Sequence, residues 1–78
     1  MPRLPRDCSG KRIVRLLEKN GYTVVRQRGS HVRLYSDQHD HSITIPDHEA
    51  IRVGTLNNII NDVAMATGIP NTTLLEEL

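Results

Sequence analysis

A stretch near the middle of the chain, R-Q-R-G-S-H-V-R-L-Y at residues 26–35, constrains the surrounding fold most strongly. Its Gly29-Ser30 pair predicts a two-residue hairpin loop, because glycine readily adopts the positive φ that a type II′ turn requires at its first position. Such a loop fixes which residues of the two strands face each other. The expected pairs are Arg28 with His31, Arg26 with Arg33, and Val24 with Tyr35.

Side chains along a strand alternate between the two faces of a sheet, so this hairpin should have one polar face and one core face. The expected polar face consists of Arg26, Arg28, His31, Arg33 and Tyr35. The expected core face consists of Val25, Gln27, Val32 and Leu34.

A third strand is expected at residues 41–45, H-S-I-T-I, after the polar turn D-Q-H-D. If Ser36 lies opposite His41, the apolar faces of all three strands agree, which supports this register. The pairs that follow are Leu34 with Ile43, Val32 with Ile45, and His31 with Pro46.

The first helix is expected over residues 10–20, with Ser9 as its N-cap. Its apolar side holds Ile13, Leu16 and Leu17. Its outer face holds Lys11, Arg12, Arg15 and Lys19. Like charges four residues apart weaken a helix slightly. This outer face could therefore bind an anionic partner, or it could simply be exposed to solvent.

The second helix is expected over residues 55–67, with Thr55 as its N-cap and Gly68 directly after its last turn. Its apolar side, which should cover the sheet, holds Leu56, Ile59, Ile60, Val63, Ala64 and Thr67. The T-x-x-E of residues 73–76 resembles a capping box for a short last helix.

The order of these elements predicts an α+β fold, α-β-β-β-α, with a three-stranded antiparallel meander, helices on one face and a short C-terminal helix. Residues 1–8 should form a loose lead-in and residues 47–53 a polar connection. The 78 residues should form a single domain, 1–78, with a core of Ile, Leu and Val, because only 3% are aromatic. A lone cysteine, Cys8, fits a reducing cytoplasm, and no segment approaches the length of a membrane span.

Charge is distributed unevenly along the chain. Residues 1–33 carry nine of the ten Lys and Arg and a net charge of +7, whereas residues 34–78 carry a net charge of −6. A basic half is the footprint expected for nucleic acid, and charges that merely coat a solvated surface are the alternative. Arg26 would face Arg33, and like charges directly opposite destabilise a sheet by up to about 1 kcal/mol. A bound polyanion would remove that penalty.

The polar face of the hairpin predicts an RNA-cleaving site in which His31 is the general base. The surrounding arginines should favour the neutral imidazole, which can accept a proton near pH 7. A base that takes the proton of a ribose 2′-OH lets that oxygen attack the adjacent phosphorus without a metal, and DNA lacks this hydroxyl. Arg side chains can stabilise the charge on the phosphoryl oxygens. The expected substrate-binding residues are Lys11, Arg26, Arg28, Ser30 and Arg33.

Histidine spacing offers a weaker alternative. His39-x-His41 could present two imidazoles to a metal ion, with Asp40 or His48 as a third ligand, but the pair spans a turn and no thiolate helps. We therefore expect neither a metal ion nor a cofactor. Two other functions stay open at this point: a non-catalytic RNA-binding module on the same basic face, and a small metal-binding adaptor that uses His39, His41 and His48.

Five short motifs occur in a specific order: S-G-K at residues 9–11, an aromatic residue after Gly21, R-Q-R-G-S-H at 26–31, I-P-D-H at 45–48 and G-T-L at 54–56. Together they resemble the HicA toxin family across nearly the whole chain. The resemblance implies a double-stranded-RNA-binding-like fold, cleavage of mRNA, and inactivation by a HicB antitoxin that masks the active surface. It places the family's catalytic histidine at His31, framed by Gly29 and Ser30. The second helix is longer than is usual in the family, which leaves the antitoxin-facing geometry open.

Overall fold

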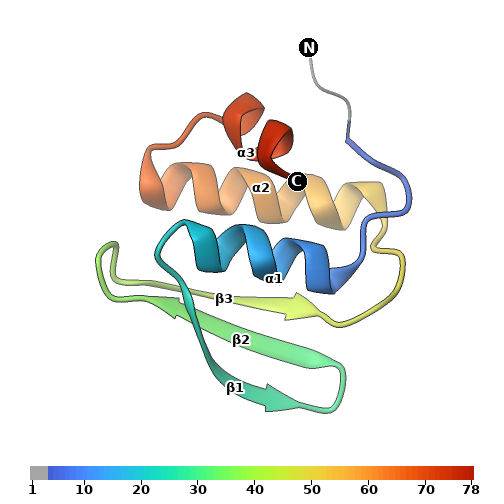
Figure 1. The fold of residues 1–78 in the computed structure, drawn as a ribbon, viewed down its shortest axis with the longest axis horizontal. Coiled ribbons are helices and arrows are strands. Elements are labelled where there is room, and N and C mark those ends of the chain that lie inside the picture. The colour runs from blue at the N-terminus through green and yellow to red at the C-terminus, as the bar shows by residue number, and fades with distance from the viewer. Residues whose placement is uncertain (1–3) are drawn as a thin grey trace.

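A three-stranded sheet with helices on one side makes up residues 4–78, the part of the chain that this computed structural model describes (Figure 1). The elements in chain order are α1 (Gly10–Lys19), β1 (Thr23–Arg28), β2 (His31–Ser36), β3 (His41–Pro46), α2 (Val53–Thr67) and α3 (Asn71–Glu77). The strands are antiparallel and follow the order β1-β2-β3 across the sheet. The predicted α+β class and the α-β-β-β-α order are confirmed.

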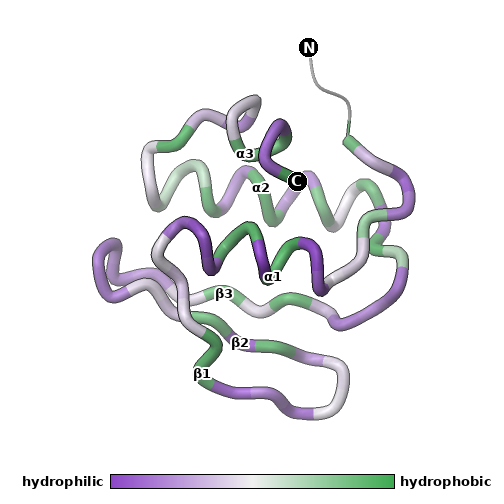
Figure 2. The backbone as a smooth tube through the Cα atoms, in the orientation of Figure 1, coloured by the Kyte–Doolittle hydropathy of each residue, from purple (hydrophilic) through white to green (hydrophobic). Residues whose placement is uncertain are grey.

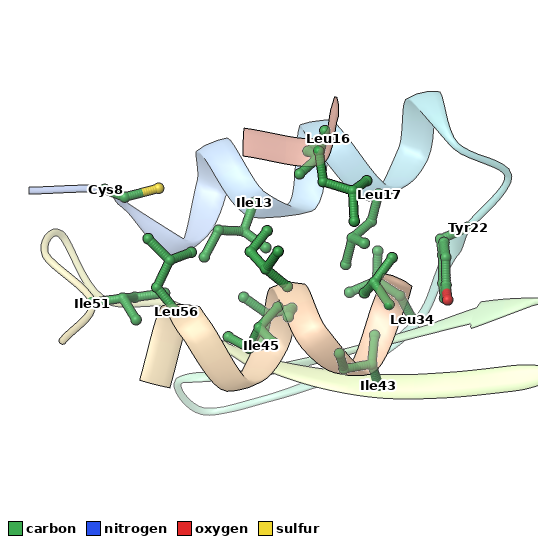
Figure 3. Close-up of a cluster of buried hydrophobic side chains, with 14 of the residues drawn as sticks. Cys8, Ile13, Leu16, Leu17, Tyr22, Leu34, Ile43, Ile45, Ile51 and Leu56 are labelled. Atoms are coloured by element: carbon green, nitrogen blue, oxygen red, sulfur yellow. The ribbon is translucent and has the colours of Figure 1, made fainter. Parts of the chain in front are cut away.

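Apolar side chains from the helices and from two of the strands form one core between the layers (Figure 3). The helices α1 and α2 contribute Ile13, Leu16, Leu17, Leu56, Ile59, Ile60 and Val63. The sheet contributes Val32, Leu34, Ile43 and Ile45. Figure 2 shows hydrophobic and hydrophilic residues alternating along α1, as one buried and one solvated side require. No helix within residues 4–78 combines the length and the apolar character needed to cross a membrane.

Strands β2 and β3 pair in the predicted register. The confirmed pairs are Ser36 with His41, Leu34 with Ile43, Val32 with Ile45, and His31 with Pro46. In the β1–β2 hairpin, the confirmed pairs are Arg28 with His31 and Arg26 with Arg33. The agreement follows from alternation, because a slip of one residue would turn the whole apolar set toward solvent.

Strand β1 departs from the prediction at a β-bulge. Val24 lies opposite Leu34 rather than opposite Tyr35, because Val25 is inserted as an extra residue between Val24 and Arg26. Val25 is 56% exposed and does not belong to the core face.

Gln27 lies opposite Val32 and shares its face as predicted, but it is not part of the core, since every residue of β1 is exposed. Strand β1 forms one edge of the sheet (Figure 1), and an open groove lined by both elements lies between it and α1. Because α1 leaves this groove open to solvent, neither side of β1 is buried, and β1 lacks the alternation of burial that β2 shows.

The start of α1 is confirmed and the start of α2 is not. The Ser9 side chain accepts a hydrogen bond from the backbone N–H of Arg12 at 3.2 Å, as an N-cap does. Helix α2 begins at Val53, and its N-cap Arg52 makes no side-chain capping bond, so the predicted cap Thr55 lies within the first turn.

Packing of the preceding segment explains the early start of α2. Ile51 is 2% exposed in the core, and its backbone N–H donates to the carbonyl of Cys8 at 2.8 Å. Cys8 is itself fully buried. The end of the lead-in (residues 1–8) therefore packs against the connection (residues 47–53), although the first was expected to be loose and the second polar. Residues 1–3 of the predicted lead-in lie outside the described residues.

The last helix also begins earlier than the capping-box pattern predicts. Helix α3 starts at Asn71 directly after Pro70, so Thr73 lies inside the helix instead of capping it. Proline presets a φ near that of a helix and thus suits the position at which a helix begins; Pro70 has a φ of −60°.

Candidate active site on the open face of the sheet

The sheet face turned away from the helices, here called the open face, carries the basic residues of the hairpin. Val32 and Leu34 of β2 are buried on the helix side, so the alternating residues of the same strand point the other way. The open face therefore holds Arg26, Arg28, His31, Arg33 and Tyr35. His31 is exposed and lies opposite Arg28 on one neighbouring strand and Pro46 on the other.

The loop beside His31 has the backbone that a tight hairpin needs. Gly29 has a φ of +58°, and no heavy atom lies within 4 Å of the place where its Cβ would be. Glycine is therefore favoured here by backbone conformation and not by lack of space. Ser30 does not have a positive φ, since Asp40 is the one non-glycine residue in residues 4–78 that does. This pattern matches the predicted type II′ turn.

One backbone hydrogen bond joins the hairpin loop to the segment after β3, and a second joins that segment to the start of α1. The N–H of Asp47 donates to the carbonyl of Ser30 at 2.6 Å, and the N–H of Gly10 donates to the carbonyl of His48 at 2.9 Å. A Cβ on Gly10 would collide with the carbonyl oxygen of Pro46, so α1 begins in direct backbone contact with the end of β3. His31 is thus placed by two strands and a helix start instead of by a loop alone.

The guanidinium of Arg33 lies across β3. It donates to the Ser42 hydroxyl at 3.0 Å and to the Thr44 hydroxyl at 3.4 Å. Both hydroxyls belong to open-face positions, because Thr44 is the partner of Arg33 in the register and Ser42 lies two residues away. These contacts orient the guanidinium along the open face while leaving Arg33 exposed to solvent.

The far end of the open face is acidic. The hydroxyl of Tyr35 donates to the Asp40 carboxylate at 3.0 Å. This hydrogen bond, together with slight desolvation and the negative charges of Asp40 and Asp37, raises the pKa of the Tyr35 hydroxyl. The cationic part of the open face therefore ends before Tyr35, and it is centred on the hairpin loop next to His31.

Lys11 lies elsewhere, although the sequence analysis grouped it with the hairpin arginines. It lines a groove between α1 and β1 together with Gln27 and Val32, which belong to the helix side of the sheet. The structure brings Arg26, Arg28, Ser30, His31 and Arg33 together around one hairpin but places Lys11 on the other side of the sheet. Helical spacing showed that Lys11 points outward from α1 but could not show toward which face.

A chain of hydrogen bonds links Tyr22, directly before β1, with His41 of β3 and Asp62 of α2. The Tyr22 hydroxyl lies 2.7 Å from Nδ1 of His41, and Nε2 of His41 lies 3.2 Å from a carboxylate oxygen of Asp62. The rings of Tyr22 and His41 also meet edge to face at 5.8 Å. Burial, and secondarily the Asp62 charge, raises the pKa of the Tyr22 hydroxyl. No sequence spacing relates residues 22, 41 and 62.

Two of the three histidines that were considered as metal ligands, His39 and His41, make hydrogen bonds within the protein. Both ring nitrogens of His41 have partners, and Nδ1 of His39 lies 3.0 Å from the buried hydroxyl of Ser36. Within residues 4–78, no group of three His, Cys, Asp or Glu side chains is arranged to hold a metal ion.

Comparison with known protein families matches residues 10–65 to the family described as "HicA toxin of bacterial toxin-antitoxin". The chain belongs to the HicA toxin family. The matched region runs from the first residue of α1 into α2 and includes the hairpin and His31, whereas α3 lies beyond it. A HicA toxin is one half of a toxin–antitoxin pair, so the partner of this chain is an antitoxin. No curated protein and no solved structure matches the chain.

Proposed function

We propose that this HicA toxin is an endoribonuclease that cleaves mRNA without a metal ion and uses His31 as its general base. The observation that carries the proposal is the position of His31, which is exposed on the open face and lies directly opposite Arg28. An accessible imidazole beside a guanidinium supplies a proton acceptor and a positive charge where a phosphodiester would need both.

The proposed reaction uses the substrate's own hydroxyl as nucleophile. His31 takes the proton of a ribose 2′-OH, and that oxygen forms a bond to the adjacent phosphorus. The bond between phosphorus and the 5′-oxygen then breaks, and the leaving oxygen receives a proton from solvent. The products are a 2′,3′-cyclic phosphate and a 5′-hydroxyl, so DNA would not be a substrate.

The proposed substrate surface consists of Arg26, Arg28, Ser30 and Arg33. Arg28 is the member closest to His31 in the register and is assigned to the charge that develops on the phosphoryl oxygens. Arg26 and Arg33 would bind flanking phosphates, which also relieves the like-charge repulsion between these paired residues. Lys11, on the other side of the sheet, is not assigned to this surface.

The partner that fits this function is a HicB-like antitoxin that covers the open face, and the pair would act in the cytoplasm, where mRNA is present. Residues 1–78 are proposed to form a single HicA-like domain, since the helices and the sheet of the described region share one core.

The His31→Ala variant tests the proposal. Loss of the general base should lower the rate of mRNA cleavage by at least about 100-fold and abolish growth arrest. Because His31 is exposed, the free energy of unfolding should stay within about 0.5 kcal/mol of wild type. The matched control is His48→Ala, which removes another exposed histidine and should keep cleavage.

Two results would contradict the proposal. Wild-type cleavage rates in purified His31→Ala protein would exclude His31 as the base. A wild-type protein that binds RNA tightly and never cleaves it would instead support the non-catalytic RNA-binding module, which the same basic face also fits.

A further inference from the structure

The outer edge of β1 is a surface that the proposed cleavage does not use. Within the sheet that residues 4–78 form, β1 pairs only with β2, so its other edge presents backbone donors and acceptors to solvent. Val24 and Val25 are 38% and 56% exposed on this strand. They are two of only four large hydrophobic side chains exposed in residues 4–78. Exposed valines next to an open strand edge are typical of a binding surface.

A groove between α1 and β1 runs beside this edge. Its apolar part is formed by Val14, Val24 and Val32, and its rim carries the cations Lys11 and Arg15. The remaining lining residues are Glu18, Gln27 and Asp47. A strand added to β1 would turn alternate side chains into this groove and the others onto the open face, next to Arg26 and Arg28. A strand that alternates apolar and acidic residues would then fill the groove with its apolar side chains and turn its carboxylates toward these two arginines.

The charge of the surface indicates which partner fits it. Four cations, on the groove rim and on β1, outnumber the two acids of the groove. A second copy of this chain is disfavoured, because pairing β1 with β1 would bring two strands with two arginines each side by side. Nucleic acid is also a poor occupant of the groove, since it offers neither apolar side chains for the valines nor a peptide backbone for the strand edge.

We propose that the outer edge of β1 and the α1–β1 groove dock an acidic, extended segment of a protein partner, which adds to the sheet as a fourth strand. The inference rests on the toxin–antitoxin function, which supplies a protein partner. A fourth strand would also place its outward carboxylates beside Arg26 and Arg28, so docking would compete with RNA on the open face.

The test uses a synthetic peptide, Glu-Val-Glu-Val-Glu-Val-Glu, titrated into the isotope-labelled full chain and followed by amide NMR. Binding should shift the amides of residues 23–28 and slow hydrogen exchange at those facing the outer edge, with α3 unaffected. The matched peptide Lys-Val-Lys-Val-Lys-Val-Lys should bind at least about 10-fold more weakly, because its charge is reversed.

Two charge reversals distinguish docking on β1 from general charge attraction. Arg28→Glu reverses a cation on the open-face side of β1, where the carboxylates of the added strand would lie, and should weaken binding of the acidic peptide by at least about 5-fold. Arg12→Glu makes the same charge change at an exposed position of α1 outside the groove and should leave affinity within about 2-fold. Circular dichroism verifies that both variants fold.

Three outcomes would overturn the proposal: no amide shifts with the acidic peptide, shifts confined to other elements, or equal affinity for the two peptides. A 2′-O-methyl octauridine that shifts the amides of the groove residues, while the acidic peptide does not, would show that the groove binds RNA.

Peptide binding is measured on His31→Ala protein as well. If wild-type protein binds the acidic peptide but cleaves no RNA, only the proposed nuclease function is contradicted. If it cleaves RNA but does not bind the peptide, only the proposed docking of a fourth strand is contradicted.

Discussion

Neighbouring residues of β2 show how differently the two faces of the sheet are used. Leu34 is fully buried against the helices, whereas Arg33, one position earlier, is exposed on the open face and donates hydrogen bonds to two hydroxyls of β3. Full burial of a leucine contributes about 1.5–3 kcal/mol, whereas exposed polar contacts contribute about 0–1 kcal/mol. The helix side thus stabilises the fold, and the open face is available for binding and chemistry.

The largest expected effect tests this difference within one strand. Leu34→Ala should lower the free energy of unfolding by about 2–5 kcal/mol, because it leaves a cavity in the core. Arg33→Ala should change it by less than about 1 kcal/mol. Urea denaturation measures both. Equal losses in the two variants would show that both faces of the sheet stabilise the fold.

A second pair of variants examines the contact between α1 and the end of β3, which joins the two faces. Gly10→Ala forces a methyl group into the Pro46 carbonyl and should cost about 1–3 kcal/mol of unfolding free energy. Gly54→Ala is the control, because no heavy atom lies within 4 Å of its Cβ position. An exposed glycine replaced by alanine in a helix should stabilise by up to about 1 kcal/mol. Thermal unfolding should therefore show a lower midpoint for Gly10→Ala and an equal or higher midpoint for Gly54→Ala than for wild type.

The buried Tyr22 hydroxyl gives an intermediate effect. At pH 7, Tyr22→Phe should cost about 1 kcal/mol, because Nδ1 of His41 loses its partner. Tyr35→Phe removes a hydroxyl from the open face and should cost less. A larger loss for Tyr35→Phe than for Tyr22→Phe would contradict the contrast between the faces.

The same tyrosine predicts a pH dependence. Burial raises its pKa in the folded state above the ordinary value of 10.0. The folded protein then holds this proton more tightly than the unfolded chain does, so the contribution is complete below the unfolded pKa and is lost as the pH rises through the folded pKa. Stability should fall above about pH 10, and less steeply in Tyr22→Phe. Urea midpoints between pH 8 and pH 11 measure this, and identical slopes for the two proteins would refute it.

The smallest expected effect has the opposite sign. Arg26→Gln removes one member of the like-charged pair with Arg33 and should stabilise the fold by less than about 1 kcal/mol. The gain should shrink in high salt, where the repulsion is screened. RNA affinity should decrease in the same variant. If Arg26→Gln destabilises the protein, the open face contributes to stability more than this comparison allows.

The sequence by itself was sufficient wherever the signal is local or alternating. Gly29 predicts the hairpin loop, Ser9 predicts the start of α1, and the apolar alternation of β2 and β3 predicts their register. These features depend on the conformation of one residue, one helical turn or one pair of strands. The arrangement of the hairpin arginines around His31 follows from the same alternation and could therefore be predicted as well.

The position of the helices on the sheet follows from tertiary packing. This position determines which strand residues are buried, and the alternation of side chains along a strand does not reveal it. The bulge in β1 and the exposure of all its residues depend on how α1 packs against the edge of the sheet, so they carry no signal in the sequence. The helix position also places Lys11 over the helix side of the sheet, away from the arginines. The contact between Tyr22, His41 and Asp62 joins residues that are distant in the chain, and such contacts arise from packing, which no local pattern encodes.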